Sequence, residues 1–142
     1  MGKLKILFLC TGNSCRSQMA EGFTRHFKSD LIDAFSAGIE THGLNSDAVS
    51  VMAEADVDIS MYQSKTLKTF ENHTFDYVIT VCSHAHETCP WFPGDSKVIH
   101  VPFDDPPRLA EQCTTLEEKH NCYRKVRDEI KAFVLELPEN LS

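Results

Sequence analysis

The spacing around Cys10 is typical of sulfur attack on a tetrahedral oxyanion. Cys10 is followed by five residues and then by Arg16, within the segment Cys-Thr-Gly-Asn-Ser-Cys-Arg-Ser. A glycine-containing loop that wraps onto a helix N-terminus turns several backbone N–H groups into one concavity, which suits such an anion. The positive end of that helix also favours the thiolate of Cys10 over its thiol. The loop therefore indicates nucleophilic attack on a bound anion.

The other side chains of the loop fit the same chemistry. Arg16 carries a planar fork of donors for two oxygens of the anion. Ser17 can hydrogen-bond the sulfur of Cys10 both when it attacks and when it leaves. We predict catalytic parts for Cys10, Arg16 and Ser17, and an oxyanion-binding loop made of Thr11, Gly12, Asn13, Ser14, Cys15 and Arg16. Cys15 is expected to be a small packing side chain, the alternative being an off-pathway disulfide with Cys10.

The elements that must position this loop alternate between strands and helices. Apolar runs predict strands over 5–9, 32–38, 77–82 and 97–101. Apolar residues at helical spacing predict helices over 17–28 and 47–55, the second capped by Ser46, and one long helix over 109–137. This alternation predicts an α/β fold with a four-stranded parallel sheet flanked by helices, and with the site at the carboxyl ends of the strands.

Length, charge and hydropathy limit the class of protein. A chain of 142 residues predicts a single domain over 1–142. A net charge of −7 argues against nucleic acid or an anionic membrane as the main partner. No apolar stretch approaches the roughly 18 residues of a membrane span. We expect a cytoplasmic monomer, in which six cysteines are more often catalytic or metal-binding than structural.

From Cys10 to Glu21 the sequence resembles the opening loop of the low-molecular-weight tyrosine phosphatase superfamily. More narrowly, it is similar to the thioredoxin-coupled arsenate reductases within that superfamily. Residues 36–43, 58–60, 103–106 and 126–130 also match the subfamily, so that the resemblance covers nearly the whole chain. It implies a low-molecular-weight phosphatase-like fold and the reduction of arsenate to arsenite, a step of arsenic detoxification.

The resemblance implies a relay of three thiols. Cys10 attacks arsenate, Cys82 attacks Cys10 so that arsenite leaves, and Cys89 then takes over the disulfide with Cys82. Thioredoxin, the implied electron donor, reduces this Cys82–Cys89 bond, and no bound cofactor is needed. Asp105 acts in the same scheme as general acid toward the departing oxygen.

Cys82 and Cys89 separate this activity from that of a phosphatase. A phosphatase needs one thiol, an anion cradle and a general acid, and water completes its reaction. If 82–89 were helical, the two Cα atoms would lie about 10.5 Å apart along the axis. A disulfide tolerates only about 7 Å between Cα atoms. Disulfide formation between Cys82 and Cys89 would therefore require the segment to unwind or loop out.

Two alternatives stay open at this point. A low-molecular-weight tyrosine phosphatase acting on phosphate monoesters would use the same loop, although Gln18 stands where phosphatases usually carry proline and Pro107 replaces a frequent aromatic. Residual activity on small aryl phosphates is compatible with the shared first step. For the segment 82–89, called here the second cysteine segment, the alternative to a redox pair is a zinc site. Its ligands would be Cys82, His84, His86 and Cys89, but their spacing matches no common zinc module.

Two further predictions concern an implied potassium site and a second pair of cysteines. The resemblance implies a potassium site at Asn13, Glu21 and Ser36, but Lys65 stands where relatives carry an acidic ligand, which puts potassium dependence in doubt. Cys113 and Cys122 lie nine positions apart in the predicted long helix, which places them on opposite faces. We therefore expect that these two cysteines do not pair with each other.

Overall fold

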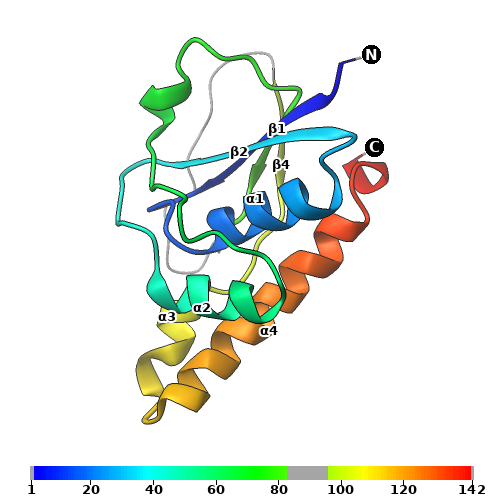
Figure 1. Cartoon of the computed structure of the whole chain (residues 1–142). Helices are drawn as coiled ribbons and strands as arrows, with labels where there is room; N and C mark the ends of the chain where they lie inside the picture. The colour runs from blue at the N-terminus through cyan, green and yellow to red at the C-terminus, as the bar shows by residue number, and fades with distance from the viewer. Residues whose placement is uncertain (1, 83–95, 142) are drawn as a thin grey trace.

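A parallel sheet of four strands forms the centre of the protein. The computed structural model describes residues 2–82 and 96–141. The strands are β1 (Leu4–Cys10), β2 (Ile32–Gly38), β3 (Tyr77–Thr80) and β4 (Lys97–His100), in the spatial order β2-β1-β3-β4 (Figure 1). Every neighbouring pair is parallel. The predicted α/β fold with a four-stranded parallel sheet is confirmed.

Both faces of β1 are buried, which explains its continuous apolar sequence. Successive side chains of a strand point to opposite faces. Ile6, Phe8 and Cys10 belong to the core shared with the helices α1 (Arg16–Phe27), α2 (Ser46–Glu54) and α4 (Leu116–Leu135). Figure 1 shows these helices on one side of the sheet. Leu7 and Leu9 face the opposite core, which includes residues of the segment 67–75 that holds the short helix η1 (Leu67–Phe70). Cys10 thus ends β1 on the helical side.

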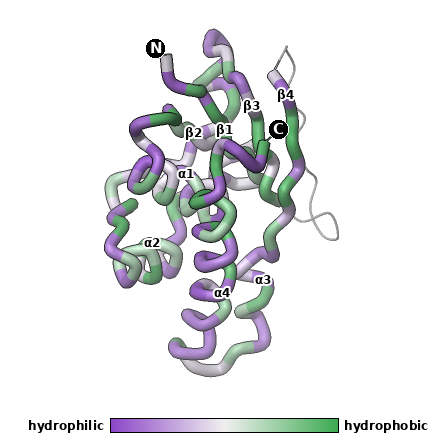
Figure 2. The backbone as a smooth tube through the Cα atoms, turned by 90° about the vertical axis from the view of Figure 1, so that its right-hand side faces the viewer, coloured by the Kyte–Doolittle hydropathy of each residue, from purple (hydrophilic) through white to green (hydrophobic). Residues whose placement is uncertain are grey.

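Hydropathy along the chain differs between the strands and the helix α4. In Figure 2 hydrophobic stretches follow the strands, whereas α4 alternates between hydrophilic and hydrophobic turns. Its buried residues recur every three or four positions: Tyr123, Val126, Ile130 and Val134. This is the predicted amphipathic pattern, and it packs α4 against α1 and α2. Within residues 2–82 and 96–141, no helix is both long enough and apolar enough to cross a membrane.

The prediction of one helix over 109–137 is wrong. The chain instead forms α3 (Pro106–Leu109), the short helix η2 (Ala110–Gln112) and, after a break, α4. Cys113 and Thr115 are extended, with ψ angles of 144° and 157°. Thr115 starts α4 with a capping box, in which its side chain accepts from the backbone of Glu118 and the Glu118 carboxylate accepts from the backbone of Thr115.

This break also overturns the placement of Cys113 and Cys122 on opposite faces, although both cysteines are free, as expected. The opposite-face argument assumed that one helix carries both residues. Cys113 lies before the break and Cys122 within α4, and their Sγ atoms are 3.7 Å apart. The two cysteines are neighbours in space.

The cap of α2 differs from the prediction by one residue. Asn45, rather than Ser46, is the N-cap, and its Oδ1 accepts from the backbone of Ala48 at 3.0 Å. The Nδ2 of Asn45 donates to the hydroxyl of Tyr123 at 3.1 Å. The capping side chain therefore also ties α2 to α4. Burial raises the pKa of Tyr123 to about 12, so its hydroxyl stays protonated in this contact.

Candidate active site

Neighbouring segments hold the loop between β1 and α1 in place through hydrogen bonds to its carbonyl groups. The carbonyl of Thr11 accepts from the backbone of Ile39 at 3.0 Å, that of Gly12 from His42 at 3.0 Å, and that of Ser14 from Asn45 at 3.0 Å. The Ser64 hydroxyl also donates to the Gly12 carbonyl at 2.8 Å. Carbonyls turned toward neighbouring segments are what an anion-binding nest requires, because its N–H groups then face the opposite way.

Gly38 lets the loop approach the end of β2. A Cβ at this position would lie 2.7–2.8 Å from the Thr11 carbonyl oxygen, the Asn13 nitrogen and the Glu40 carbonyl oxygen. All three atoms belong to the backbone, so they cannot move aside independently of the loop. Only glycine fits here, and the parallel pairing of Cys10 with Gly38 places this close contact directly beside Cys10.

A cavity of about 450 Å³ opens above this loop. It is lined by Cys10, Thr11, Gly12, Ser14, Cys15 and Arg16 from the loop, and by Ile39, Glu40, His42, Asp105 and Pro107 from two other segments. The structure thus brings Cys10, Arg16 and Asp105 to one cavity. Ile39 and Glu40 were missed by the sequence reasoning. Their position directly after β2, beside the end of β1, is the signal that could have found them.

The sulfur of Cys10 is met by an oriented hydroxyl. Cys10 Sγ lies 3.0 Å from Ser17 Oγ, and the Nδ2 of Asn13 donates to the same oxygen at 2.8 Å. Because Ser17 Oγ already accepts from Asn13, its own hydrogen can be donated to the sulfur. Cys10 is 3% exposed, so this hydrogen bond forms in a nearly dry environment, where it is stronger than in water.

Asn13 shapes the loop from within and is not part of the cavity lining described above. It has a positive φ of 49°, a conformation that asparagine tolerates better than most residues. Its Oδ1 accepts from the backbone of Lys65 at 2.8 Å and from the Gln18 amide at 3.0 Å. The side chain of Asn13, predicted as part of the oxyanion cradle, therefore connects the loop to Ser17, Gln18 and Lys65.

Contacts that include Phe103 and Asp105 hold Arg16 at the start of α1. Its guanidinium donates to the carbonyl of Phe103 at 3.0 Å and forms an ion pair with Asp105 at 3.4 Å. Asp105 precedes Pro106 as the N-cap residue of α3, and about a third of its side chain is exposed. The arginine fork and the predicted general acid thus face the same cavity from two segments far apart in sequence.

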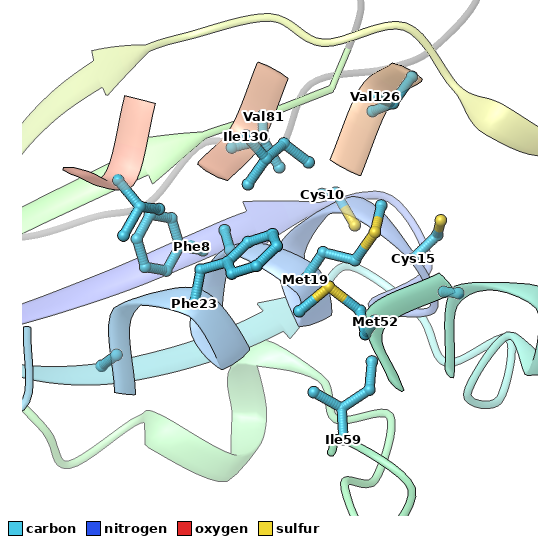
Figure 3. Close-up of a cluster of buried hydrophobic side chains, with 14 of the residues drawn as sticks. Phe8, Cys10, Cys15, Met19, Phe23, Met52, Ile59, Val81, Val126 and Ile130 are labelled. Atoms are coloured by element: carbon cyan, nitrogen blue, oxygen red, sulfur yellow. The ribbon is translucent and has the colours of Figure 1, made fainter. Parts of the chain in front are cut away.

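Cys15 is a packing residue in a setting that keeps it protonated. It is 3% exposed, and Figure 3 shows its side chain beside that of Cys10, at the edge of the buried cluster with Met19 and Val126. Burial, and then the neighbouring Cys10, raise the pKa of Cys15 well above its usual value. A neutral thiol is a poor nucleophile. Cys15 is therefore disfavoured as a competitor of Cys10.

Cys82 is buried next to the end of β1. The backbone of Val81 donates to the Leu9 carbonyl at 2.9 Å, which continues the pairing of β3 with β1 beyond Thr80. Cys82 follows directly, is fully buried and belongs to the same core cluster as Cys10. It is not among the residues that line the cavity. A second thiol thus lies two residues past the end of β3, the strand next to β1, in the core that it shares with Cys10.

Three residues of the second cysteine segment lie outside the described residues. They are His84, His86 and Cys89, which belong to 83–95. The predicted Cys82–Cys89 disulfide and the rival zinc site both depend on them, and both stay predictions.

The residues of the implied potassium site do not fit that ion here. The amide nitrogen of Gln18 donates at 3.0 Å to the carbonyl and side-chain oxygens of Asn13 and to the carbonyl of Gln63. Glu21 accepts from the Ser36 hydroxyl and from Arg25. The oxygens of Asn13 and Glu21 are therefore already acceptors of N–H or O–H groups, and the Ser36 hydroxyl is already a donor.

Lys65 carries a positive charge into the same region. Its Nζ donates to the carbonyl of Gln63 at 2.9 Å. Burial lowers the pKa of Lys65, and the nearby Glu21 carboxylate acts in the opposite direction. The ammonium group of Lys65 thus belongs to the region of the implied potassium site, as the doubt about potassium dependence anticipated.

Comparison with known proteins agrees with this geometry. The family model of the low molecular weight phosphotyrosine protein phosphatases matches residues 5–142. An arsenate reductase from Halalkalibacterium halodurans is 48% identical over 130 residues, which cover 92% of this chain and 91% of the relative. An arsenate reductase from Bacillus subtilis is 45% identical over 134 residues, which cover 94% of both chains.

A solved structure gives the same assignment. It is described as an arsenate reductase in the phosphate binding state, has a TM-score of 0.78 and is 29% identical, with 98% of this chain and 99% of that chain covered. The resemblance seen in the sequence is confirmed over nearly the whole chain. The chain therefore belongs to the low molecular weight phosphotyrosine protein phosphatase family, where its most similar relatives include arsenate reductases.

Proposed function

We propose that this protein reduces arsenate to arsenite through Cys10, Cys82 and Cys89, with thioredoxin as electron donor. The observation that carries the proposal is the buried thiol of Cys82 in the core that it shares with Cys10, the nucleophile of the anion loop. Hydrolysis needs only the first of these thiols, whereas a two-electron reduction needs both. The relatives named arsenate reductases support the same choice.

In the first step, the Cys10 thiolate attacks pentavalent arsenic in the cavity. A sulfur–arsenic bond forms, and one arsenate oxygen leaves as water with a proton from Asp105. Arg16 and the backbone N–H groups hold the other oxygens, which accumulate charge in the transition state. The Ser17 hydroxyl, oriented by Asn13, stabilises the sulfur before attack.

In the second step, the Cys82 thiolate attacks the sulfur of Cys10. The electron pair of the sulfur–arsenic bond passes to arsenic, which leaves as trivalent arsenite, and a Cys10–Cys82 disulfide forms. Cys89 then attacks Cys82, which frees Cys10 and leaves the Cys82–Cys89 disulfide. The dithiol of thioredoxin reduces that bond by exchange and is itself oxidised.

The coupled assay with thioredoxin, thioredoxin reductase and NADPH tests this proposal. We expect NADPH oxidation that depends on arsenate, and we expect Cys89→Ser to release arsenite once per chain and then stop. The serine cannot resolve the Cys10–Cys82 disulfide, so mass spectrometry of peptides should find that bond in the stalled variant. Multiple turnover by Cys89→Ser would contradict the assignment of the third thiol.

Phosphatase activity is the second candidate, because the anion cavity and Asp105 would also serve phosphate monoesters. The assay is phosphate release from an aryl phosphate by the wild type and by Cys82→Ser. Equal phosphate release by both, together with no arsenate reduction by the wild type, would make hydrolysis the function.

Potassium should be dispensable for activity. Gln18 and Lys65 already supply N–H groups to the oxygens that the ion would need. We expect equal arsenate turnover in potassium chloride and in choline chloride. Lys65→Asp should gain a dependence on potassium, because it restores an acidic ligand, whereas Lys68→Asp, an exposed control in η1, should not. Loss of wild-type turnover in choline chloride would show that the ion is required.

A further inference from the structure

A second pair of thiols lies apart from the cavity. The Sγ atoms of Cys113 and Cys122 are 3.7 Å apart, and both cysteines are free and half-buried. A disulfide would need about 2.05 Å between the sulfurs. Figure 1 shows the connection between α3 and α4, which carries Cys113, at the lower end of the molecule and away from the sheet. The proposed reduction uses neither thiol.

Local structure fixes the position of each thiol. The backbone of Cys113 donates to the carbonyl of Ala110 at 3.0 Å at the end of η2. The capping box of Thr115 and Glu118 fixes where α4 begins, and Cys122 follows within that helix. The sulfur–sulfur distance is therefore set by two folded elements on either side of a short connection.

The distance fits two sulfurs bound to one thiophilic atom. Metal–sulfur bonds of about 2.3 Å at a roughly tetrahedral angle place the two sulfurs about 3.7–3.8 Å apart. Structural zinc takes four protein ligands, and within 2–82 and 96–141 no group of three or more His, Cys, Asp or Glu residues could hold a metal ion. Trivalent arsenic needs fewer: it binds two sulfurs and keeps one hydroxyl. Its pyramidal geometry has a narrower angle than a tetrahedral site, so the two sulfurs must move slightly closer than 3.7 Å to bind it.

We infer that Cys113 and Cys122 form a binding site for trivalent arsenic. Arsenite is the product of the proposed function, and the inference rests on that function for the source of its ligand. The site would retain product that leaves the cavity.

The binding reaction balances without any oxidant. Arsenous acid and two thiols give a bis-thiolate of arsenic with one remaining hydroxyl, and two water molecules leave. Two arsenic–oxygen bonds break, two arsenic–sulfur bonds form, and the thiol protons leave with the displaced hydroxyls.

Arsenite binding by the reduced full-length chain tests the inference. Cys10→Ser/Cys82→Ser/Cys89→Ser serves as background, because it removes the thiols of the proposed relay. We expect one arsenic per chain by native mass spectrometry and the loss of two titratable thiols. Adding Cys113→Ser or Cys122→Ser should weaken arsenite binding by roughly 10²–10⁴-fold, the usual gain from an intramolecular second contact.

A relocated thiol provides the matched control. Cys122→Ser combined with Asn121→Cys keeps the number of thiols but moves one of them about 100° around α4. Arsenite should bind this variant as weakly as Cys122→Ser alone. Equal binding by the background chain, both single serine variants and the relocated variant would overturn the inference.

Arsenate turnover separates this inference from the proposed function. Cys113→Ser and Cys122→Ser in an otherwise native chain should turn over arsenate at the wild-type rate, because neither residue lines the cavity. Arsenite binding at the dithiol without any arsenate reduction by the wild type would contradict the proposed function alone. Normal reduction with no arsenite bound at Cys113 and Cys122 would contradict this inference alone.

Discussion

Replacement of Cys82 by alanine should stop arsenate turnover and leave the anion cavity intact. Without the second thiol, the Cys10 adduct has no nucleophile to attack its sulfur, so arsenite is not released. We expect turnover to fall by about 10³-fold or more, the scale seen when one member of a catalytic unit is removed. Alkylation of Cys10 by iodoacetamide, and its protection by phosphate, should stay as in the wild type.

Alanine is the better test of Cys82 than serine. Cys82 is fully buried in the core, and moving a hydroxyl from water into such surroundings costs more than moving a methyl group. The melting temperature of Cys82→Ala should therefore be measured beside its turnover, to separate lost chemistry from lost folding. Cys113→Ser is the matched control, because it removes a thiol far from the cavity and should keep full turnover.

Cys15 supplies the outcome that would contradict this assignment. It is the other buried thiol next to Cys10. If Cys82→Ala kept its turnover while Cys15→Ala released no arsenite, Cys15 would be the attacking thiol. The raised pKa of Cys15 argues against that result, because a thiol attacks a sulfur only as its thiolate.

The sheet and the anion loop could be predicted because short-range patterns determine them. A continuous apolar run such as β1 is buried on both faces in almost any parallel sheet, and Cys10 at its end is then placed at the carboxyl edge. The spacing from Cys10 to Arg16 fixes the loop and the helix start together. Neither inference needed knowledge of distant contacts.

The break between α3 and α4 could not be predicted from periodicity. Apolar spacing continues through Leu109, Leu116 and Tyr123, yet Leu116 is 64% exposed. The competing signal is the capping box of Thr115 and Glu118, which a search for helical periodicity passes over. Because this cap was not recognised, the sequence prediction placed Cys113 on the wrong face of a helix and did not predict its contact with Cys122.

The internal role of Asn13 also lay beyond the sequence. A loop motif indicates which residues surround an anion but not which side chains turn inward. The positive φ of Asn13 and its bond to Ser17 depend on Lys65 and Gln18, the first of them 52 residues away. A side chain that organises a loop through such contacts cannot be told from a ligand-binding one by spacing alone.

Replacement of Arg16 by lysine should lower kcat by about 10²–10³-fold, the usual effect of removing one oxyanion donor. Lysine keeps the charge but loses the planar fork. The fork is what allows Arg16 to bond the Phe103 carbonyl through one nitrogen and Asp105 through the other while the side chain lines the cavity. A buried ammonium that holds only one of these partners would also leave Asp105 less well placed to deliver its proton.

Steady-state kinetics of the reductase assay, together with phosphate binding by calorimetry, measure this loss. Arg25→Lys is the matched control, because it makes the same substitution in α1 at a side chain that is half exposed, pairs with buried Glu21 and does not line the cavity. Lysine keeps the positive charge beside Glu21, and Arg25 is not part of the cavity lining, so kcat should stay close to the wild-type value. Equal, small effects of both substitutions would mean that charge alone holds the anion. A large loss confined to Arg16→Lys would show that the paired donors of the guanidinium do so.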